Sequence, residues 1–201
     1  MAGGALMNVS AATLKGPVVT LEPLRRRHLP GLGKAARGTD IWHYMAANLV
    51  VEDALEPWYA EARRLEKAAQ QLPFAIRLTA EGALIGSTRY LNIAPEHRRL
   101  EVGWTWLAPA NWGGRANAAA KLLLFEHAFE KLGAHRVELR TDALNQRARR
   151  SILKLGAVEE GLLRRHMVMP GGRVRDTVQF AVIDDIWPAV KTALETRIAE
   201  N

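Results

Sequence analysis

Two adjacent glycines, Gly113 and Gly114, stand where the sequence changes from a strand-like pattern to a helical one. The preceding run, residues 100–107, is typical of a β-strand, and residues 117–132 have the apolar spacing of a long amphipathic helix. Glycine lets the backbone come close to a ligand, and the first N–H groups of a helix are unpaired and lie at its positive dipole end. This arrangement can hold a diphosphate. Glycine pairs also occur in simple connecting turns, so the loop alone leaves that alternative open.

A carboxylate lies in the strand that leads into this loop. Alternation predicts one bulky face made of Leu100, Val102, Trp104 and Trp106, and an opposite face made of Glu101, Gly103, Thr105 and Leu107. The small neighbours of Glu101 would leave room for a ligand above the backbone, where a carboxylate can act as a general base. A bulge would shift the register beyond Thr105. The alternative is a structural Glu101, exposed at a sheet edge or paired with Arg98 or Arg136.

A second segment, residues 141–157, combines a strand that ends at Asp142 with a helix that begins at Asn145 and stops at Gly156. Asparagine is also a favourable N-cap, so Asn145 has a local structural role available to it. Together with the loop at 111–116, this segment resembles the two cofactor-binding segments of the GNAT N-acetyltransferase superfamily.

The resemblance covers most of residues 74–183. In the superfamily loop pattern, Gln/Arg-x-x-Gly-x-Gly/Ala, Gly114 and Ala116 take the last two defined places, whereas Asn111 stands where Gln or Arg is usual. The chain also resembles the Rim-type branch, which contains ribosomal-protein N-terminal acetyltransferases, at Trp112, Asn117 and residues 176–187.

The resemblance implies which residues hold acetyl-CoA. The pantetheine arm would enter a gap where the strand 100–107 splays from the strand 136–141. The pantetheine arm and the acetyl oxygen would be held by the backbone of Trp106, Leu107 and Ala108, and Asn145 would form a hydrogen bond to the arm. The diphosphate would be held by backbone amides of Gly113, Gly114, Arg115, Ala116 and Asn117, and the Arg115 side chain would add a cation.

The resemblance also assigns acid–base roles. Glu101 stands near the place of the general base in several members, acting through a water and helped by an apolar setting that raises its pKa. His97 and His166 are the fallback bases.

The general acid has no matching residue in this chain. The superfamily's Tyr position is Ile152, and the Ser position of Rim-type relatives is Ala148. Ser151 is offset by one helical turn and does not inherit the role.

The pattern of elements predicts an α+β fold with a mixed, mostly antiparallel central sheet flanked by helices. We expect a flexible tail over residues 1–16 and a single GNAT-like domain over residues 17–201. The remaining elements are expected at 18–21, 53–71, 74–78, 84–93, 136–141, 145–155, 162–169, 174–183 and a helix that carries Ile186, Val190, Leu194 and Ile198 on one stripe.

Composition narrows the class of protein. The 201 residues contain no cysteine, which excludes disulfides and thiolate chemistry, and the six histidines lack the spacing of a metal site. No signal sequence or membrane span is visible, so a cytoplasmic location is expected. The net charge of +7 suits a polyanionic partner, but the basic runs are scattered, which makes nucleic acid unlikely as a partner. Six tryptophans and an apolar C-terminal helix suggest a homodimer.

These observations favour an enzyme that transfers an acetyl group from acetyl-CoA to a primary amine of a small molecule or of a protein N-terminus, without a metal. Two alternatives stay open. One is a non-catalytic acyl-CoA-binding module, which the missing general acid favours, and the other is a basic nucleic-acid-binding protein.

Overall fold

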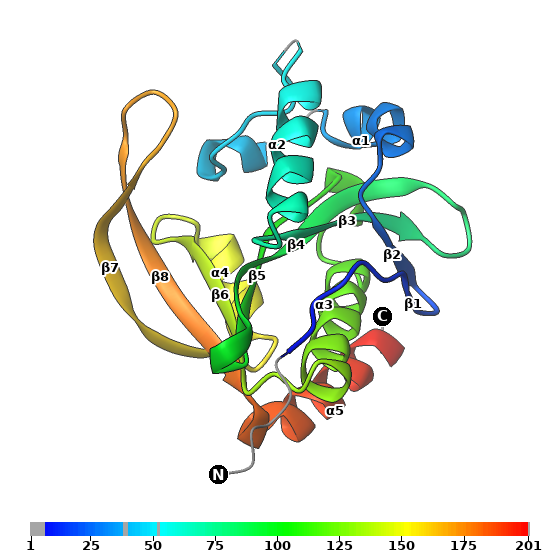
Figure 1. The fold of residues 1–201 in the computed structure, drawn as a ribbon, viewed down its shortest axis with the longest axis vertical. Coiled ribbons are helices and arrows are strands. Elements are labelled where there is room, and N and C mark those ends of the chain that lie inside the picture. The colour runs from blue at the N-terminus through cyan, green and yellow to red at the C-terminus, as the bar shows by residue number, and fades with distance from the viewer. Residues whose placement is uncertain (1–6, 38–39, 52, 201) are drawn as a thin grey trace.

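The chain is built around one eight-stranded sheet, seen in a computed structural model that describes residues 7–37, 40–51 and 53–200 (Figure 1). The strand order is β1-β2-β3-β4-β5-β6-β8-β7, and every neighbouring pair is antiparallel except β5 and β6. The strands are β1 Leu14–Lys15, β2 Val19–Pro23, β3 Leu72–Leu78, β4 Leu84–Ala94, β5 Arg99–Leu107, β6 Arg136–Asp142, β7 Val158–Val168 and β8 Val174–Ile183. The predicted mixed, mostly antiparallel sheet is confirmed.

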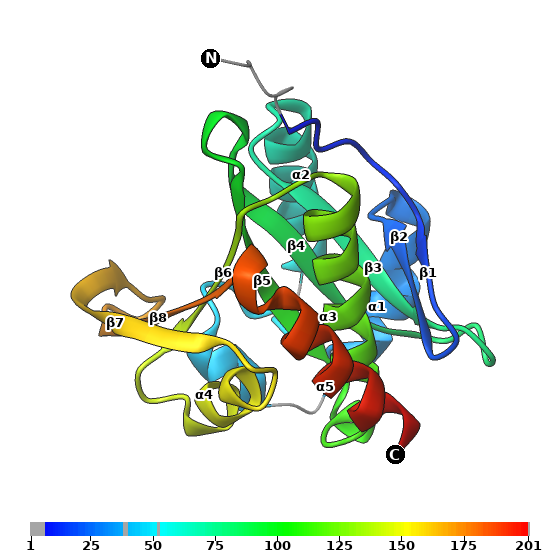
Figure 2. The same ribbon diagram turned by 90° about the horizontal axis from the view of Figure 1, so that it is seen from below.

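Helices cover both faces of the sheet (Figures 1 and 2). The α-helices are α1 Leu29–Ala35, α2 Leu55–Lys67, α3 Ala116–Glu126, α4 Gln146–Leu153 and α5 Trp187–Ala199. Alternation along β3 separates two cores, because Phe74 and Ile76 pack with α3 and α5 while Ala75 packs with α1 and α2. The sheet is therefore packed on both faces.

Several predicted boundaries differ from the structure. The helix expected over 53–71 is the shorter α2, and β7 begins at Val158 instead of residue 162. Residues 7–16 were expected in a flexible tail, yet Met7 is buried in the core and Leu14–Lys15 pairs with β2. Residues 1–6 of that tail lie outside the described residues.

A β-bulge in β5 changes which side chains share a face. Ser87 pairs with Trp106 but Arg89 pairs with Gly103, so Trp104 and Thr105 together oppose one residue of β4, and Trp104 has a φ of 50°. The predicted alternation is therefore wrong beyond Gly103. Trp104 and Trp106 pack toward α1 and α2, whereas Leu107 joins the core under α3 with Leu100 and Val102. Because of the bulge, Thr105 faces α3 together with Leu107.

Gly86 of β4 is packed against the backbone of β5. A Cβ atom at Gly86 would lie 2.0 Å from the carbonyl oxygen of Trp106, so the two strands would have to move apart. We expect Gly86→Ala to lower the free energy of unfolding by about 3 kcal/mol or more, at the upper end of single-substitution effects. Denaturant unfolding measures the change. The matched control is Gly161→Ala in β7, where a Cβ would meet nothing within 4 Å; an equal loss in both variants would contradict the steric argument.

Candidate functional site

The sheet opens between β5 and β6. These parallel strands pair with each other only over Arg99–Glu101 and Arg136–Glu138. Beyond that point β5 remains paired with β4 and β6 with β8, but β5 and β6 do not pair with each other. Glu101 is the last residue of β5 that pairs with β6 and therefore marks the closed end of the opening. The splay that the resemblance implied is present.

The other end of the opening leads to the glycine loop. β5 ends at Leu107, a short 3₁₀ turn covers Pro109–Asn111, and α3 begins at Ala116. Gly113 has a φ of 76°, and a Cβ on Gly113 or Gly114 would meet nothing within 4 Å. Among the described residues, no side chain caps the N-terminus of α3. The first N–H groups of this helix are therefore available to an anion, which the positive end of the helix dipole would also attract.

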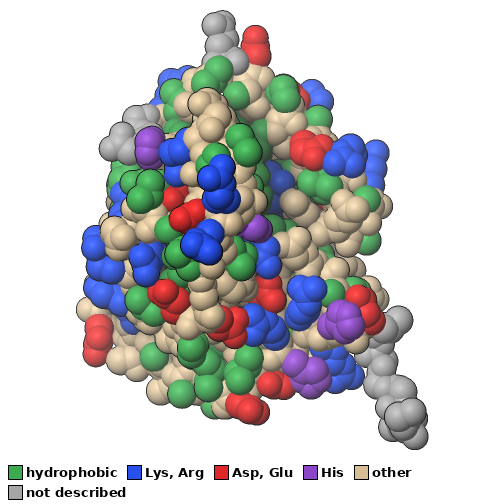
Figure 3. All heavy atoms as spheres, turned by 90° about the vertical axis from the view of Figure 1, so that its left-hand side faces the viewer, with side chains coloured by type: hydrophobic (Ala, Val, Ile, Leu, Met, Phe, Trp, Pro, Cys, Tyr) green, Lys and Arg blue, Asp and Glu red, His purple; other side chains and the backbone are tan. Residues whose placement is uncertain are grey.

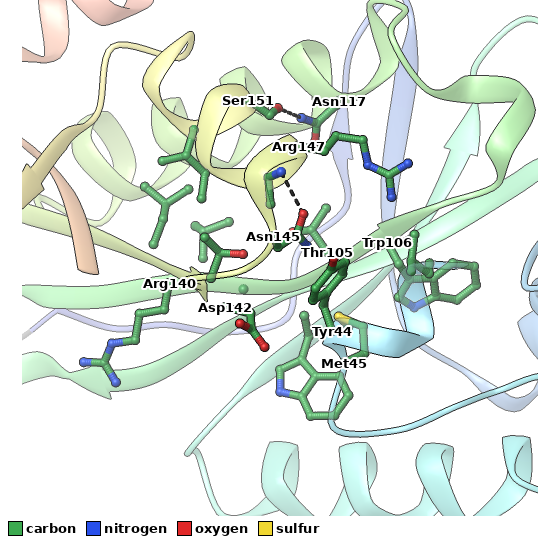
Figure 4. Close-up of a pocket in the computed structure, with 18 of the residues that line it drawn as sticks. Tyr44, Met45, Thr105, Trp106, Asn117, Arg140, Asp142, Asn145, Arg147 and Ser151 are labelled. Carbon is green, nitrogen blue, oxygen red and sulfur yellow. Dashed lines mark hydrogen bonds between the residues drawn. The ribbon is translucent and has the colours of Figure 1, made fainter. Parts of the chain in front are cut away.

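A cavity of about 520 Å³ occupies the opening and joins these two ends (Figure 4). Six of the predicted site residues line it: Glu101, Trp106, Leu107, Gly113, Asn117 and Asn145. Four others do not, namely Ala108, Gly114, Arg115 and Ala116. Ala108 cannot serve as the predicted donor without a change, because its N–H already donates to the Ile85 carbonyl at 2.7 Å.

Glu101 is a buried carboxylate on the wall of the cavity, with 5% of its surface exposed. The Asn92 side-chain amide donates to Oε2 at 2.7 Å, and Arg140 Nε lies 3.4 Å from the same oxygen. Burial raises the pKa of Glu101, and the Arg140 charge and the Asn92 hydrogen bond oppose that rise. Glu101 thus pairs with Arg140, and not with Arg98 or Arg136 as in the structural alternative. The raised pKa of Glu101 suits a group that takes up a proton.

Two asparagines hold the helices beside the opening. Asn145 caps α4, with Oδ1 accepting the Ala148 N–H at 3.0 Å, and this confirms its expected N-cap role. Asn117 Nδ2 donates to Ser151 Oγ at 3.2 Å and so ties the first turn of α3 to α4 (Figure 4). Both helix starts are therefore fixed at the edge of the cavity.

The candidate acid–base positions differ in whether they line the cavity. Ile152 and Ala148 line the cavity, so the family positions for the general acid face it with aliphatic side chains. His97 lies in an exposed turn, with 67% of its side chain exposed, outside the cavity. His166 does line the cavity and pairs with Thr177 Oγ1 at 3.1 Å, while burial and the charges of Arg140 and Arg175 lower its pKa.

Other cavity residues were not predicted from the sequence. The 3₁₀ turn Asp40–Tyr44 and the residues after it contribute Tyr44 and Met45, and β8 contributes Arg175. On α4, the guanidinium of Arg147 lies 3.8 Å from the ring centroid of Trp112, beside the glycine loop. Lys121 of α3 lines the floor of the cavity. A signal for Lys121 was present, since it precedes the buried Leu124 and Phe125 by three and four residues on one helical stripe.

The described residues offer neither a metal cluster nor a membrane-spanning helix. Within the described residues there is no group of three or more His, Cys, Asp or Glu side chains that could hold a metal ion. None of the described helices has both the length and the apolar character needed to cross a bilayer. On the face that carries β7 and β8, Lys and Arg side chains are interspersed with acidic and hydrophobic ones (Figure 3).

Comparison with known proteins identifies the family. A family model described as an acetyltransferase (GNAT) domain matches residues 19–158, and the chain belongs to this family. A GCN5-related N-acetyltransferase from Brucella melitensis has 30% sequence identity and a TM-score of 0.86, covering 94% of this chain and 86% of its own. Mycobacterium smegmatis RimJ, solved in complex with CoA-disulfide, has 25% identity and a TM-score of 0.76, covering 92% and 93%.

A curated relative matches over a shorter stretch. The uncharacterized N-acetyltransferase YoaA of Bacillus subtilis (strain 168) is 28% identical over 100 residues, which are 50% of this chain and 55% of that protein. The match therefore spans about half the length of the curated relative.

Proposed function

We propose that this protein transfers an acetyl group from acetyl-CoA to a primary amine. The observation that carries the proposal is the opening between β5 and β6, with the buried Glu101 at its closed end and the uncapped N-terminus of α3 at the other. A long ligand with a diphosphate at one end and a reacting group at the other matches this distribution of groups.

The residues present fit acetyl-CoA. The open space at Gly113 and Gly114 and the first N–H groups of α3 suit a diphosphate, and Arg147 over Trp112 offers a cation next to them. Asn145 uses its Oδ1 as the helix cap, which leaves its amide N–H groups to donate to the pantetheine arm. Trp106 and Leu107 would line the arm, and Arg115 and Ala116 would contribute through the loop backbone.

Glu101 is assigned the role of general base. The acceptor amine must lose a proton as it attacks the thioester carbonyl, and a carboxylate with a raised pKa accepts that proton directly or through a water. Arg140 and Asn92 hold the carboxylate in place through its Oε2, so Oε1 is left to face the cavity.

The acceptor is a primary amine of a small molecule or a protein N-terminus. The similarity to RimJ supports the second option, as do Trp112 and Asn117 in the loop. The walls that would meet the acceptor come from residues 41–46 and from the β7–β8 hairpin, through Tyr44, Met45, His166 and Met167.

Thiol release from acetyl-CoA in the presence of a panel of amines and N-terminal peptides tests the proposal, with product masses identifying the acceptor. Acetyl-CoA binding without thiol release for any acceptor would instead support a non-catalytic acyl-CoA-binding module. Tight retention on heparin that collapses steeply with salt, with no acetyl-CoA binding, would support a nucleic-acid-binding protein.

We further propose a homodimer, but on a surface other than the tryptophans and the C-terminal helix that suggested it in the sequence. Trp42, Trp58, Trp106 and Trp187 are buried, and α5 packs on α3, so neither feature is left to form an interface. Exposed apolar side chains instead lie on the β7–β8 hairpin, and β7 is the last strand of the sheet. They are Val158, Leu162, Leu163, Val168 and Val174.

Light scattering is expected to give twice the chain mass for the wild-type protein. Leu162→Glu should shift the mass to that of a monomer and leave the circular dichroism spectrum of the folded chain unchanged, since Leu162 is 51% exposed. A wild-type monomer at high concentration would remove the proposal.

A further inference from the structure

Lys121 is a buried lysine inside an otherwise apolar part of α3. Only 5% of its surface is exposed, and its neighbours along the helix include the buried Ala118, Ala120 and Leu124. Its Nζ donates to Thr105 Oγ1 at 2.7 Å. Placing an ammonium group in such a setting is costly, and an aliphatic side chain would stabilise the fold more. The position therefore points to a use beyond packing.

Thr105 brings this lysine into contact with the opening between β5 and β6. The bulge at Trp104 turns Thr105 toward α3, and both Thr105 and Lys121 line the cavity. Thr105 Oγ1 also lies 2.8 Å from Thr88 Oγ1. Either hydroxyl can be the donor of this contact, and when Thr88 donates to Thr105 Oγ1 the hydrogen of Thr105 is free to point into the cavity.

Thr105 lies between the two groups that would position the ligand. Along β5 it follows Glu101 by four residues, and it precedes Trp106 and Leu107, which would line the arm. The thioester sulfur belongs between the reacting carbonyl and the arm, and so beside Thr105. Acetyl transfer releases this sulfur as a thiolate, which needs a proton, and the family positions for the donor are Ile152 and Ala148.

We propose that the Thr105 hydroxyl protonates the departing thiolate and that Lys121 resupplies its proton. As the carbon–sulfur bond breaks, its electron pair on sulfur takes the hydrogen of Thr105, and Thr105 Oγ1 takes a hydrogen from the Lys121 ammonium. Lys121 is left as a neutral amine. The proton that Glu101 removes from the acceptor returns through solvent and restores the ammonium. Lys121 acts through Thr105 and is a positioning residue; the inference rests on the proposed acetyl transfer.

The protonation equilibrium of Lys121 is suited to this step. Burial lowers the pKa of Lys121 to about 7. The charged and titratable side chains that line the same cavity are Tyr44, Glu101, Arg140, Asp142, Arg147, His166 and Arg175. An acid whose pKa is near the working pH is half protonated there, so it gives up and regains a proton readily.

Lys121→Met tests the proposal, because methionine has a similar length and carries no proton. We expect kcat to fall by about 100-fold or more, the lower bound for general acid–base catalysis, with an unchanged Kd for acetyl-CoA. The wild-type fall in kcat above pH about 7 should disappear in the variant, since it reflects loss of the ammonium form. Thr105→Val should cause a similar loss, and the double variant should be no slower than either single variant.

Two measurements separate this role from a structural one. With the selenoester analogue of acetyl-CoA, whose selenolate leaves without a proton, Lys121→Met should recover most of the wild-type rate. In the free protein, the folded state holds Lys121 neutral above its lowered pKa while the unfolded chain remains protonated. The wild-type free energy of unfolding should therefore rise as the pH increases from about 7 toward 10.5, and this rise should be absent in Lys121→Met.

The outcomes distinguish this inference from the proposed function. If wild-type protein acetylates no amine, the proposed function fails. If it does, but Lys121→Met keeps its kcat and its pH profile, only the role of Lys121 is overturned. If the fall in kcat above pH about 7 disappears in Tyr44→Phe or Ser151→Ala but persists in Lys121→Met, the proton donor is that hydroxyl and not the Thr105–Lys121 pair.

Discussion

Glu101→Gln is expected to lower kcat by about two to four orders of magnitude at neutral pH, the usual range for general acid–base catalysis. The substitution keeps the size of the side chain and its hydrogen bond from Asn92 but removes the proton acceptor. Because burial raises the pKa of Glu101, the wild-type rate should rise with pH through that raised value, and this acidic limb should flatten in the variant. Steady-state kinetics from pH 5 to 9, on an identified acceptor, measure both effects.

Glu138→Gln is the matched control for this prediction. Glu138 faces Glu101 across the β5–β6 pair, is also buried, and also pairs with Arg140, but it does not line the cavity. Its loss should lower stability and leave the shape of the pH profile unchanged. Near-native turnover of Glu101→Gln would end the assignment of the base. A loss of stability without a change in the profile would identify Glu101 as a structural partner of Arg140.

Gly114→Val is expected to weaken acetyl-CoA binding by about 10- to 100-fold, since each hydrogen bond to a charged group contributes about 1.5–3 kcal/mol. A branched side chain in the loop would keep the diphosphate from the N–H groups at the start of α3. A Cβ at Gly114 meets nothing within 4 Å, so the fold should tolerate the change and the loss should lie in binding alone. Isothermal titration calorimetry with acetyl-CoA measures the Kd.

The corresponding control is Gly161→Val, in which a side chain is added to an equally open glycine of β7, away from the cavity. This variant should bind acetyl-CoA as the wild type does. Unchanged affinity in a folded Gly114→Val protein would show that the diphosphate lies elsewhere.

The fold was predictable where local patterns decide it. The helix after the glycine loop, the α4 cap at Asn145 and the β7–β8 hairpin follow from periodicity, capping and turn residues. The face of Thr105 was not predictable, because the bulge at Trp104 depends on how β5 pairs with Thr88 and Arg89 of β4. A bulge places one extra residue of a strand opposite its partner and so reverses the faces of the residues beyond it. The alternation of residue types in the sequence does not show where this happens.

The site shows the same division. Glu101, Gly113 and Asn145 each belong to a short sequence pattern, and the structure brings them to one cavity. Tyr44 and Arg175 reach the same cavity from 3₁₀ and strand elements far apart in the chain, and only tertiary packing brings them there. The role inferred for Lys121 depended on the direction of Thr105, and so on the bulge.

The short pairing between β5 and β6 has a consequence for ligand selectivity. Beyond Glu101, the edge of β5 that faces β6 has no strand partner, although β4 still pairs with its other edge. If acetyl-CoA binds in the opening as proposed, its pantetheine arm would take the place of a missing strand and be recognised by main-chain hydrogen bonds, as in β-augmentation. Such recognition favours an arm with amide groups at peptide-like spacing and does not distinguish between acyl groups attached to its end. On this proposal, selection among acyl groups would come from the side chains around Glu101.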